Sequence, residues 1–313
     1  MAESSARDAP TPEELRWWRQ ARRPQAVPAV LRDYVATVYP PVVDPAGRAA
    51  SDSLLRYFLL AEGLVEGLWP IVVRFVELLG PGQTVWGIKR LPGGRCGVEL
   101  YVYDPHRDAS FAPKGRDNPR SVTRLVAGLA GVVAVDSRLD DDRASYHMAS
   151  LELDATVAAT GRSDGFRIYP TGDRRRHGYD GVSYHVAGDR LVRENHYRFF
   201  SAADELDEVR AALAASIRRG PDPDRLLDPV LCRCHTICFS SKAHGDALYF
   251  SRLDTAQVLA VLPRLWPGAV ERALRHHADD FAHLRWDLGI DFRVPATDLS
   301  AVTIDKVGLY GFI

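Results

Sequence analysis

The feature that most constrains the fold of this chain is a recurrence of paired short segments in which polar and apolar residues alternate. Such alternation predicts β-strands, and Gly or Asp between the two members of a pair predicts a hairpin turn. Five pairs occur, the second being the least regular because its connection is longer: 84–91 with 95–103, 145–153 with 165–169, 181–186 with 191–199, 233–240 with 247–252, and 284–294 with 302–312.

Helical periodicity occupies four stretches between or before these pairs: 54–79, 121–135, 202–219 and 255–281. Single strands alternating with helices would build a parallel sheet. Antiparallel pairs instead predict an α+β fold, in which ten strands from five hairpins close into a barrel and the helices pack outside it.

One face of several predicted strands is consistently polar and aromatic. In the strand 95–103, Glu99, Tyr101 and Tyr103 share a face, and the apolar residues lie opposite. The strands 166–169, 247–252, 284–294 and 302–312 alternate in the same way. A half-solvated antiparallel sheet would produce the same pattern. The repeated tyrosines and the accompanying helices favour a helix-covered barrel with a polar lumen.

Composition sets outer limits on function. With 40 Lys and Arg against 41 Asp and Glu, the formal net charge is −1, which argues against a protein that coats nucleic acid or an anionic membrane. The sequence has no apolar run of membrane-spanning length and no N-terminal signal segment, so we expect a cytoplasmic protein. Residues 1–25 are predicted to be a flexible segment with one short helix starting at Thr11, and residues 26–313 to be a single domain.

Three stretches near the C-terminus carry a likeness to a known family. They are the run from Cys234 to Lys242, the run from Asp246 to Arg252 leading into a helix, and the final strand from Thr303 to Tyr310. Together with the five hairpins they make the chain resemble the ABBA prenyltransferases, and within that group the cyanobactin peptide prenyltransferases. The resemblance covers the last quarter of the chain best and does not extend convincingly to residues 136–180.

The resemblance implies that a prenyl group, dimethylallyl or geranyl, moves from its diphosphate to an aromatic small molecule or a peptide inside the barrel. It implies no tightly bound cofactor, and leaves open whether Mg²⁺ accompanies the prenyl diphosphate. Cations must then hold the diphosphate, aromatic faces must shield the allylic carbocation, and a base must take a proton. The candidates are Glu99 as base; Lys89, Arg167, Arg293 and Lys306 for the diphosphate; and Tyr101, Tyr103, Tyr169, Tyr249 and Tyr310 for the shield.

Other interpretations stay open at this point. The rival from another class is a non-catalytic barrel that binds a hydrophobic small molecule or a peptide, and an enzyme of unrelated chemistry is a third. Asp140–Asp142 suggests a magnesium site but is better explained as a solvated turn, since consecutive residues point in different directions. Cys232, Cys234 and Cys238 would be too far apart on one strand to share a zinc ion. Gly161–Gly165 matches a serine-hydrolase motif, but a strand-like run follows it instead of a helix.

Overall fold

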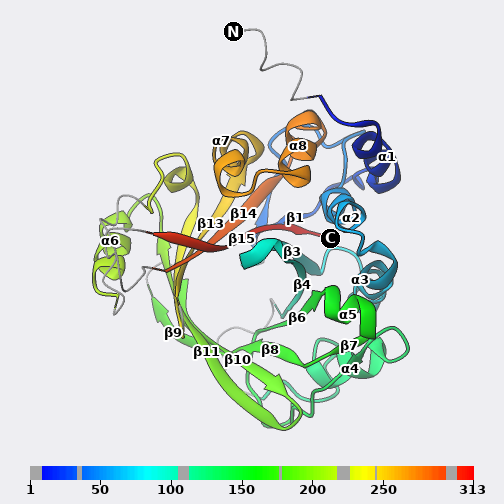
Figure 1. The fold of residues 1–313 in the computed structure, drawn as a ribbon. Coiled ribbons are helices and arrows are strands. Elements are labelled where there is room, and N and C mark those ends of the chain that lie inside the picture. The colour runs from blue at the N-terminus through cyan, green and yellow to red at the C-terminus, as the bar shows by residue number, and fades with distance from the viewer. Residues whose placement is uncertain are drawn as a thin grey trace.

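Ten antiparallel strands form a closed barrel in the computed structural model, which describes residues 9–33, 37–104, 113–175, 178–216, 226–243, 245–293 and 302–313. Each strand pairs with the next around the barrel, and β11 pairs with both β10 and β12, which closes the ring (Figure 1). An eleventh strand, β9 (Thr171–Arg175), pairs with β10 beside the ring. In order around the ring the strands are β3 (Thr84–Arg90), β4 (Cys96–Tyr103), β6 (Met148–Asp154), β8 (Phe166–Tyr169), β10 (Gly178–Ala187), β11 (Arg190–Ser201), β12 (Thr236–Lys242), β13 (Asp246–Asp254), β14 (Arg285–Arg293) and β15 (Thr303–Phe312).

All five predicted hairpins are confirmed, and with them the α+β barrel. Two details of the prediction are wrong. The stretch 171–180, which lies between two predicted hairpins and to which no strand was assigned, contains β9 and the start of β10. The strand expected from residue 233 begins only at Thr236, after a short 3₁₀ helix at Leu231–Arg233, so Cys232 and Cys234 are not on the strand that carries Cys238.

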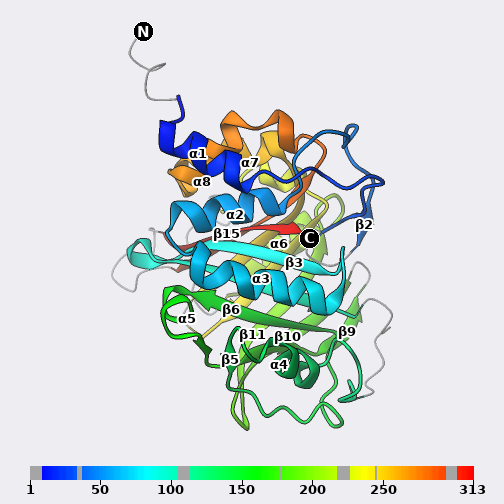
Figure 2. The same cartoon turned by 90° about the vertical axis from the view of Figure 1, so that its right-hand side faces the viewer.

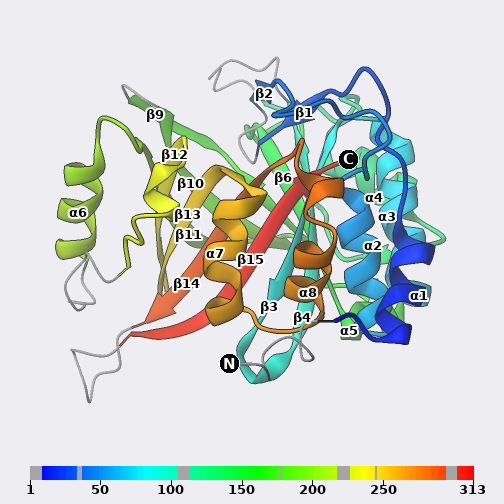
Figure 3. The same ribbon diagram turned by 90° about the horizontal axis from the view of Figure 1, so that it is seen from above.

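Eight α-helices are present in the described part of the chain, most of them outside the strands. They are α1 (Pro12–Ala21), α2 (Asp52–Ala61), α3 (Val65–Leu79), α4 (Val122–Leu129), α5 (Ala155–Thr160), α6 (Leu206–Ala214), α7 (Thr255–Leu265) and α8 (Ala269–His276). Figure 2 shows α3 lying along β3 on the outer surface, with α2 and α1 stacked beyond it. Figure 3 shows α7 beside β14, and α8 between α7 and α2. The described connections also contain two short strand pairs, β1 (Leu31–Arg32) with β2 (Val38–Tyr39) and β5 (Ala134–Val135) with β7 (Arg162–Ser163). Two further 3₁₀ turns lie at Pro92–Gly94 and Asp279–Phe281.

The N-terminal helix is packed onto this body. The helix begins with Thr11 as its N-cap, as predicted, and Thr11 and Glu14 form a capping box in which each side chain accepts a hydrogen bond from the other residue's backbone N–H. Trp18 is buried and stacks on His277, with the ring centroids 3.9 Å apart. Glu14 forms an ion pair with Arg272 at 2.6 Å. The chain is therefore docked from Pro12 onward; residues 1–8 lie outside the described residues.

The core lies between the barrel and its helices. Trp86 of β3 and Trp286 of β14 are fully buried on the outer face of the sheet, with ring centroids 6.2 Å apart. Their indole N–H groups donate to the hydroxyls of Ser51, at the start of α2, and Thr255, at the start of α7. These bonds satisfy the polar ends of two large apolar side chains, and they fix both helices to the sheet.

Three bulges interrupt the regular pairing within the ring of ten strands, and they affect which residues enter the lumen. Glu194 in β11 and Asp305 in β15 are each one residue more than the partner strand has. The third bulge, in β13, contains Arg252 at φ 61°, which contacts two buried carboxylates: its backbone N–H donates to Asp287 at 2.8 Å and its side chain to Asp33 at 2.6 Å. A bulge places two residues of one strand opposite one residue of its partner, so the added side chain no longer follows the regular inward and outward alternation.

Within the described ranges, no helix has both the length and the apolar character needed to cross a membrane.

Candidate functional site

The lumen contains a cavity of about 530 Å³ whose walls are tyrosines and charged side chains. Eight of the ten residues proposed from the sequence line it: Glu99, Lys89, Arg167, Lys306, Tyr101, Tyr169, Tyr249 and Tyr310. The other two do not. Tyr103 is buried among inner-face residues but does not line this cavity. Arg293 has a side chain that is 57% exposed and that binds the lining residue Asp305 at 2.9 Å, and it does not itself line the cavity. The bulge at Asp305 lies between Arg293 and the lumen-facing part of the hairpin.

Five tyrosines form a continuous band around the inner wall. In the order Tyr249, Tyr310, Tyr101, Tyr169 and Tyr197, the ring centroids of neighbours lie 6.0–6.4 Å apart. Burial raises the pKa of Tyr169 and of Tyr310 well above the ordinary phenol value, so both rings stay neutral. The band therefore presents uncharged, electron-rich rings along one arc of the cavity.

Two glycines make room for these rings. Gly87 of β3 lies opposite Tyr310, and a Cβ atom there would come within 2.4 Å of the Tyr310 ring. Gly289 of β14 lies opposite Tyr249, and its Cβ atom would come within 2.7 Å of that ring. Because each tyrosine leans over a glycine on the neighbouring strand, the large and small residues alternate between strands and leave the centre of the barrel open.

A first group of charges forms an alternating chain on the wall made by β3, β4, β6, β8 and β11. Lys89 lies between Glu99 and Glu152, and Arg167 lies between Glu152 and Glu194. The Lys89–Glu152 distance is 3.2 Å and the Arg167–Glu194 distance is 2.7 Å. We call this group the acidic chain, because its five members begin and end with a carboxylate and sum to a formal charge of −1.

Glu99 is the most deeply placed member of the acidic chain. Its side chain is 4% exposed, and its oxygens accept hydrogen bonds from the hydroxyls of Tyr101 at 2.6 Å and Ser150 at 2.5 Å. Burial opposes ionisation of this carboxyl, but the Lys89 ammonium outweighs burial and holds the pKa of Glu99 below its usual range. Glu99 is therefore a carboxylate at neutral pH, and its position in the cavity wall gives it access to a bound molecule.

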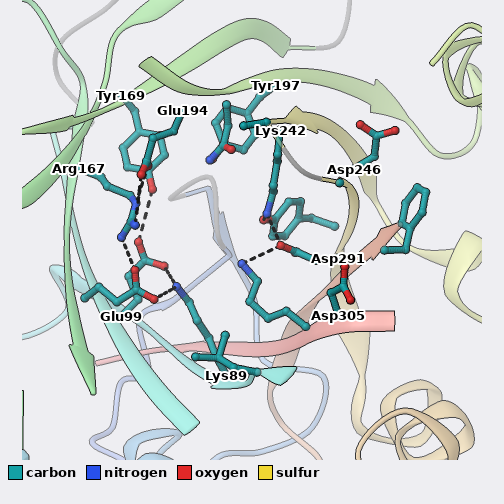
Figure 4. Close-up of a pocket in the computed structure, with 18 of the residues that line it drawn as sticks. Lys89, Glu99, Arg167, Tyr169, Glu194, Tyr197, Lys242, Asp246, Asp291 and Asp305 are labelled. Atoms are coloured by element: carbon teal, nitrogen blue, oxygen red, sulfur yellow. Dashed lines mark hydrogen bonds and ion pairs between the residues drawn. The ribbon is translucent and has the colours of Figure 1, made fainter. Parts of the chain in front are cut away.

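A second group of charges lies across the lumen on β12, β14 and β15 (Figure 4). Lys242 and Lys306 both contact the same oxygen of Asp291, Lys306 at 2.9 Å, and Lys242 also donates to the hydroxyl of Tyr249 at 3.1 Å. We call Lys242, Asp291 and Lys306 the lysine pair site, and its formal charge is +1. Burial and the neighbouring Lys242 ammonium lower the pKa of Lys306 to about 8. Because two buried lysines share one carboxylate, a further anion beside them would be stabilised.

The sequence interpretation missed several lining residues. Lys242 lies two residues past the predicted end of its strand at residue 240, although it is an even number of residues from Cys238 and so lies on the same inward face. Glu152 and Tyr197 lie inside predicted strands on the inward face, so extending the alternation would have identified both. Glu194 and Asp305 are placed by bulges, for which the alternation gives no signal.

The other motifs do not form sites. Asp141, expected in a solvated turn, is 1% exposed and accepts a hydrogen bond from the backbone N–H of Thr123 at 2.8 Å, at the first turn of α4. Gly161 ends α5 in a left-handed conformation and β7 follows, the reverse of the strand-to-helix order that a serine nucleophile needs. Among the residues that the structure describes, no three His, Cys, Asp or Glu side chains are grouped to hold a metal ion.

A search with models of protein families and a comparison with curated protein sequences found no match to this chain.

Proposed function

We propose that the protein is a prenyltransferase, which moves a dimethylallyl or geranyl group from its diphosphate to an aromatic or peptide acceptor in the barrel lumen. The observation that carries the proposal is the meeting of three groups in one cavity: a band of five tyrosines, a site of two lysines sharing one carboxylate, and a buried, ionised Glu99. Each of the three supplies what one step of prenyl transfer requires.

The lysine pair site is the part of the cavity best suited to the diphosphate. Lys242 and Lys306 together carry one positive charge more than Asp291 neutralises. Lys89 and Arg167, which the sequence also suggested, are each held between two carboxylates and have no such surplus. A diphosphate at Lys306 would raise the pKa of that lysine again, and the added attraction would stabilise the bound anion.

Ionisation of the donor breaks the bond between C1 of the prenyl group and the diphosphate oxygen, and the electron pair leaves with the diphosphate. The resulting allylic cation needs an environment that excludes water and offers π-faces. Tyr249 contacts Lys242 through its hydroxyl and lies beside Tyr310, so the tyrosine band begins directly at the proposed diphosphate site. This arrangement lets the cation form against neutral rings while its leaving group is held by the lysines.

Attack by an aromatic carbon forms the new carbon–carbon bond and leaves a cationic ring that must lose a proton. A proton on such a ring is strongly acidic, so a carboxylate of low pKa is a sufficient base. Glu99 is ionised and in the cavity wall, and its Tyr101 partner belongs to the tyrosine band. We assign Glu99 as the group that accepts this proton, which restores the aromatic ring of the product.

A second candidate is a barrel that binds a small molecule or peptide without catalysis. One observation favours it: among the described residues that line the cavity, six carboxylates outnumber five cations, whereas a site for a free diphosphate would be expected to carry a cationic excess throughout. The lining cations are Lys89, Arg167, Arg193, Lys242 and Lys306, and the carboxylates are Glu99, Glu152, Glu194, Asp246, Asp291 and Asp305.

Calorimetric titration with dimethylallyl and geranyl thiolodiphosphates, with and without Mg²⁺, distinguishes the two candidates. Wild type should bind at least one of them, and Lys306→Met should lose at least ten-fold in affinity. Arg143→Met, which removes a cation whose side chain is 88% exposed, is the matched control and should bind like wild type. Binding by wild type justifies a mass-spectrometric search for prenylated acceptors, in which Glu99→Gln should bind the donor and fail to transfer it. If neither thiolodiphosphate binds, the non-catalytic barrel is favoured.

A further inference from the structure

The two charge groups give the cavity an electrical polarity. The acidic chain, Glu99–Lys89–Glu152–Arg167–Glu194, alternates in sign and ends in carboxylates, and the lysine pair site, Lys242–Asp291–Lys306, alternates and ends in ammonium groups. Figure 4 shows Glu99, Arg167 and Glu194 on one side of the lumen and Lys242 and Asp291 on the other. The two groups thus sum to −1 on one side and +1 on the other, and with Arg193, Asp246 and Asp305, which also line the cavity, the lining charges sum to −1.

From this polarity we infer that the acceptor carries a positively charged nitrogen group, an amine or a guanidinium, which binds against the acidic chain. The inference rests on the proposed function and adds the chemical class of the acceptor to it. A neutral acceptor would leave the negative wall without a counter-charge, and an anionic acceptor would be repelled by it. A cationic group brings the acidic chain to neutrality.

The ends of the acidic chain decide where such a cation binds. Lys89 and Arg167 each already contact two carboxylates, and Glu152 already contacts two cations, so the inner three members are satisfied. Glu99 and Glu194 each contact only one cation within the chain. Glu99 is 4% exposed and also binds the hydroxyl groups of Tyr101, Ser150 and Tyr169, whereas the Glu194 side chain is 28% exposed. Glu194 is therefore the end at which an entering cation pairs with least loss of existing contacts.

The origin of Glu194 supports a role in binding. It is the added residue of the bulge in β11, between Arg193 and Asn195, and it lines the cavity together with both of them. Regular pairing would turn every second side chain of β11 away from the lumen. The bulge brings one extra carboxylate into the wall, and that carboxylate turns a neutral chain of four charges into a chain of charge −1.

A charge series built on one ring tests this inference. Tyramine is cationic, 4-ethylphenol is neutral, and 3-(4-hydroxyphenyl)propionate is anionic, and all three carry the same phenol. Each is titrated calorimetrically into wild type, Glu194→Gln and Glu208→Gln, first alone and then with geranyl thiolodiphosphate present. Glu208 lies exposed on α6, so its variant removes one carboxylate outside the cavity as a matched control.

Wild type and Glu208→Gln should bind tyramine at least about ten-fold more tightly than 4-ethylphenol, and the propionate most weakly. Glu194→Gln should lose most of that preference. The inference is wrong if tyramine fails to bind, if 4-ethylphenol binds as tightly, or if the preference survives in Glu194→Gln. The two proposals fail separately: thiolodiphosphate binding without amine preference removes only the acceptor class, and amine preference without thiolodiphosphate binding removes prenyl transfer and leaves a cation-binding lumen.

Discussion

Replacing Lys89 with Met tests whether the acidic chain is a structural ion-pair array. Lys89 is 3% exposed and is the cation between Glu99 and Glu152. Removing one partner of a buried pair leaves an uncompensated charge and costs about 3–5 kcal/mol. Since the free energy of unfolding of a native protein is about 5–15 kcal/mol, the variant should lose a large part of its stability. Adding Glu99→Gln removes the stranded charge, so the double variant should recover most of the loss.

The pH dependence of this effect follows from the pKa of Glu99. Although burial opposes ionisation, in wild type Lys89 holds this pKa below its ordinary value, so Glu99 contributes stability that is present above that value and lost as the pH falls through the lowered one. Without Lys89, burial should raise the pKa, and protonation should relieve the variant. The difference in free energy of unfolding between wild type and Lys89→Met should therefore become smaller as the pH falls below neutral.

Urea unfolding followed by tryptophan fluorescence gives the free energy of unfolding of all four proteins of this cycle: wild type, the two single variants and the double variant. The reasoning is refuted if Lys89→Met lies within about 1 kcal/mol of wild type, or if the double variant is no more stable than Lys89→Met.

Four further predictions concern the lumen and the closure of the barrel. Lys306→Met should not lower stability near neutral pH, because burial and Lys242 depress the pKa of Lys306 to about 8 and make its charge unfavourable in the folded state; urea unfolding showing a loss above about 2 kcal/mol contradicts this. In wild type the unfolded state binds the Lys306 proton more tightly than the folded state does, so the free energy of unfolding should rise between pH 8 and the ordinary lysine pKa of about 10.4. Thiolodiphosphate affinity should fall above pH 8, because Lys306 loses its charge there. A calorimetric affinity that stays constant from pH 7 to 9 would count against the lysine pair site. Gly289→Ala places a Cβ atom 2.7 Å from the Tyr249 ring and should cost about 1–3 kcal/mol in urea unfolding, with an unchanged midpoint as the contrary result. Deleting residues 303–313 removes β15, which pairs with both β14 and β3, and should abolish soluble folding; a soluble truncation with the far-UV circular dichroism of wild type contradicts the closed barrel.

The alternation of the strands was enough to predict the barrel and the direction of most lumen residues. In β4, Val98 and Leu100 alternate strictly with Glu99 and Tyr101. Val98 and Leu100 pack in the core between the barrel and its helices, whereas Tyr101 packs among the lumen residues, so the two faces of the strand differ clearly in residue type. Lys242 was missed because its strand ends in a serine-rich run with little apolar alternation. If the predicted strand had been extended by two residues beyond residue 240, the alternation would have placed Lys242 on the inward face with Cys238.

The bulges limited the rest of the prediction. Glu194 and Asp305 enter the cavity, and Arg293 lies largely outside it, next to positions where one strand has an extra residue. An extra residue reverses the inward and outward parity of the residues after it, and no glycine marks either position in the sequence. Opposite charges also cannot be paired from one strand at a time: Lys89 and Arg167 looked like free cations until the fold placed Glu152 between them.

The central claim is that the diphosphate of a prenyl donor binds at Lys242 and Lys306 with its hydrocarbon chain against the tyrosine band. The most direct measurement is a crystal structure of the protein with geranyl thiolodiphosphate, in which the anomalous signal of sulfur marks the bond that would break. We predict the diphosphate on Lys242 and Lys306 and the sulfur within the cavity beside Tyr249 and Tyr310. A diphosphate bound at Lys89 and Arg167, or outside the lumen, would contradict the account.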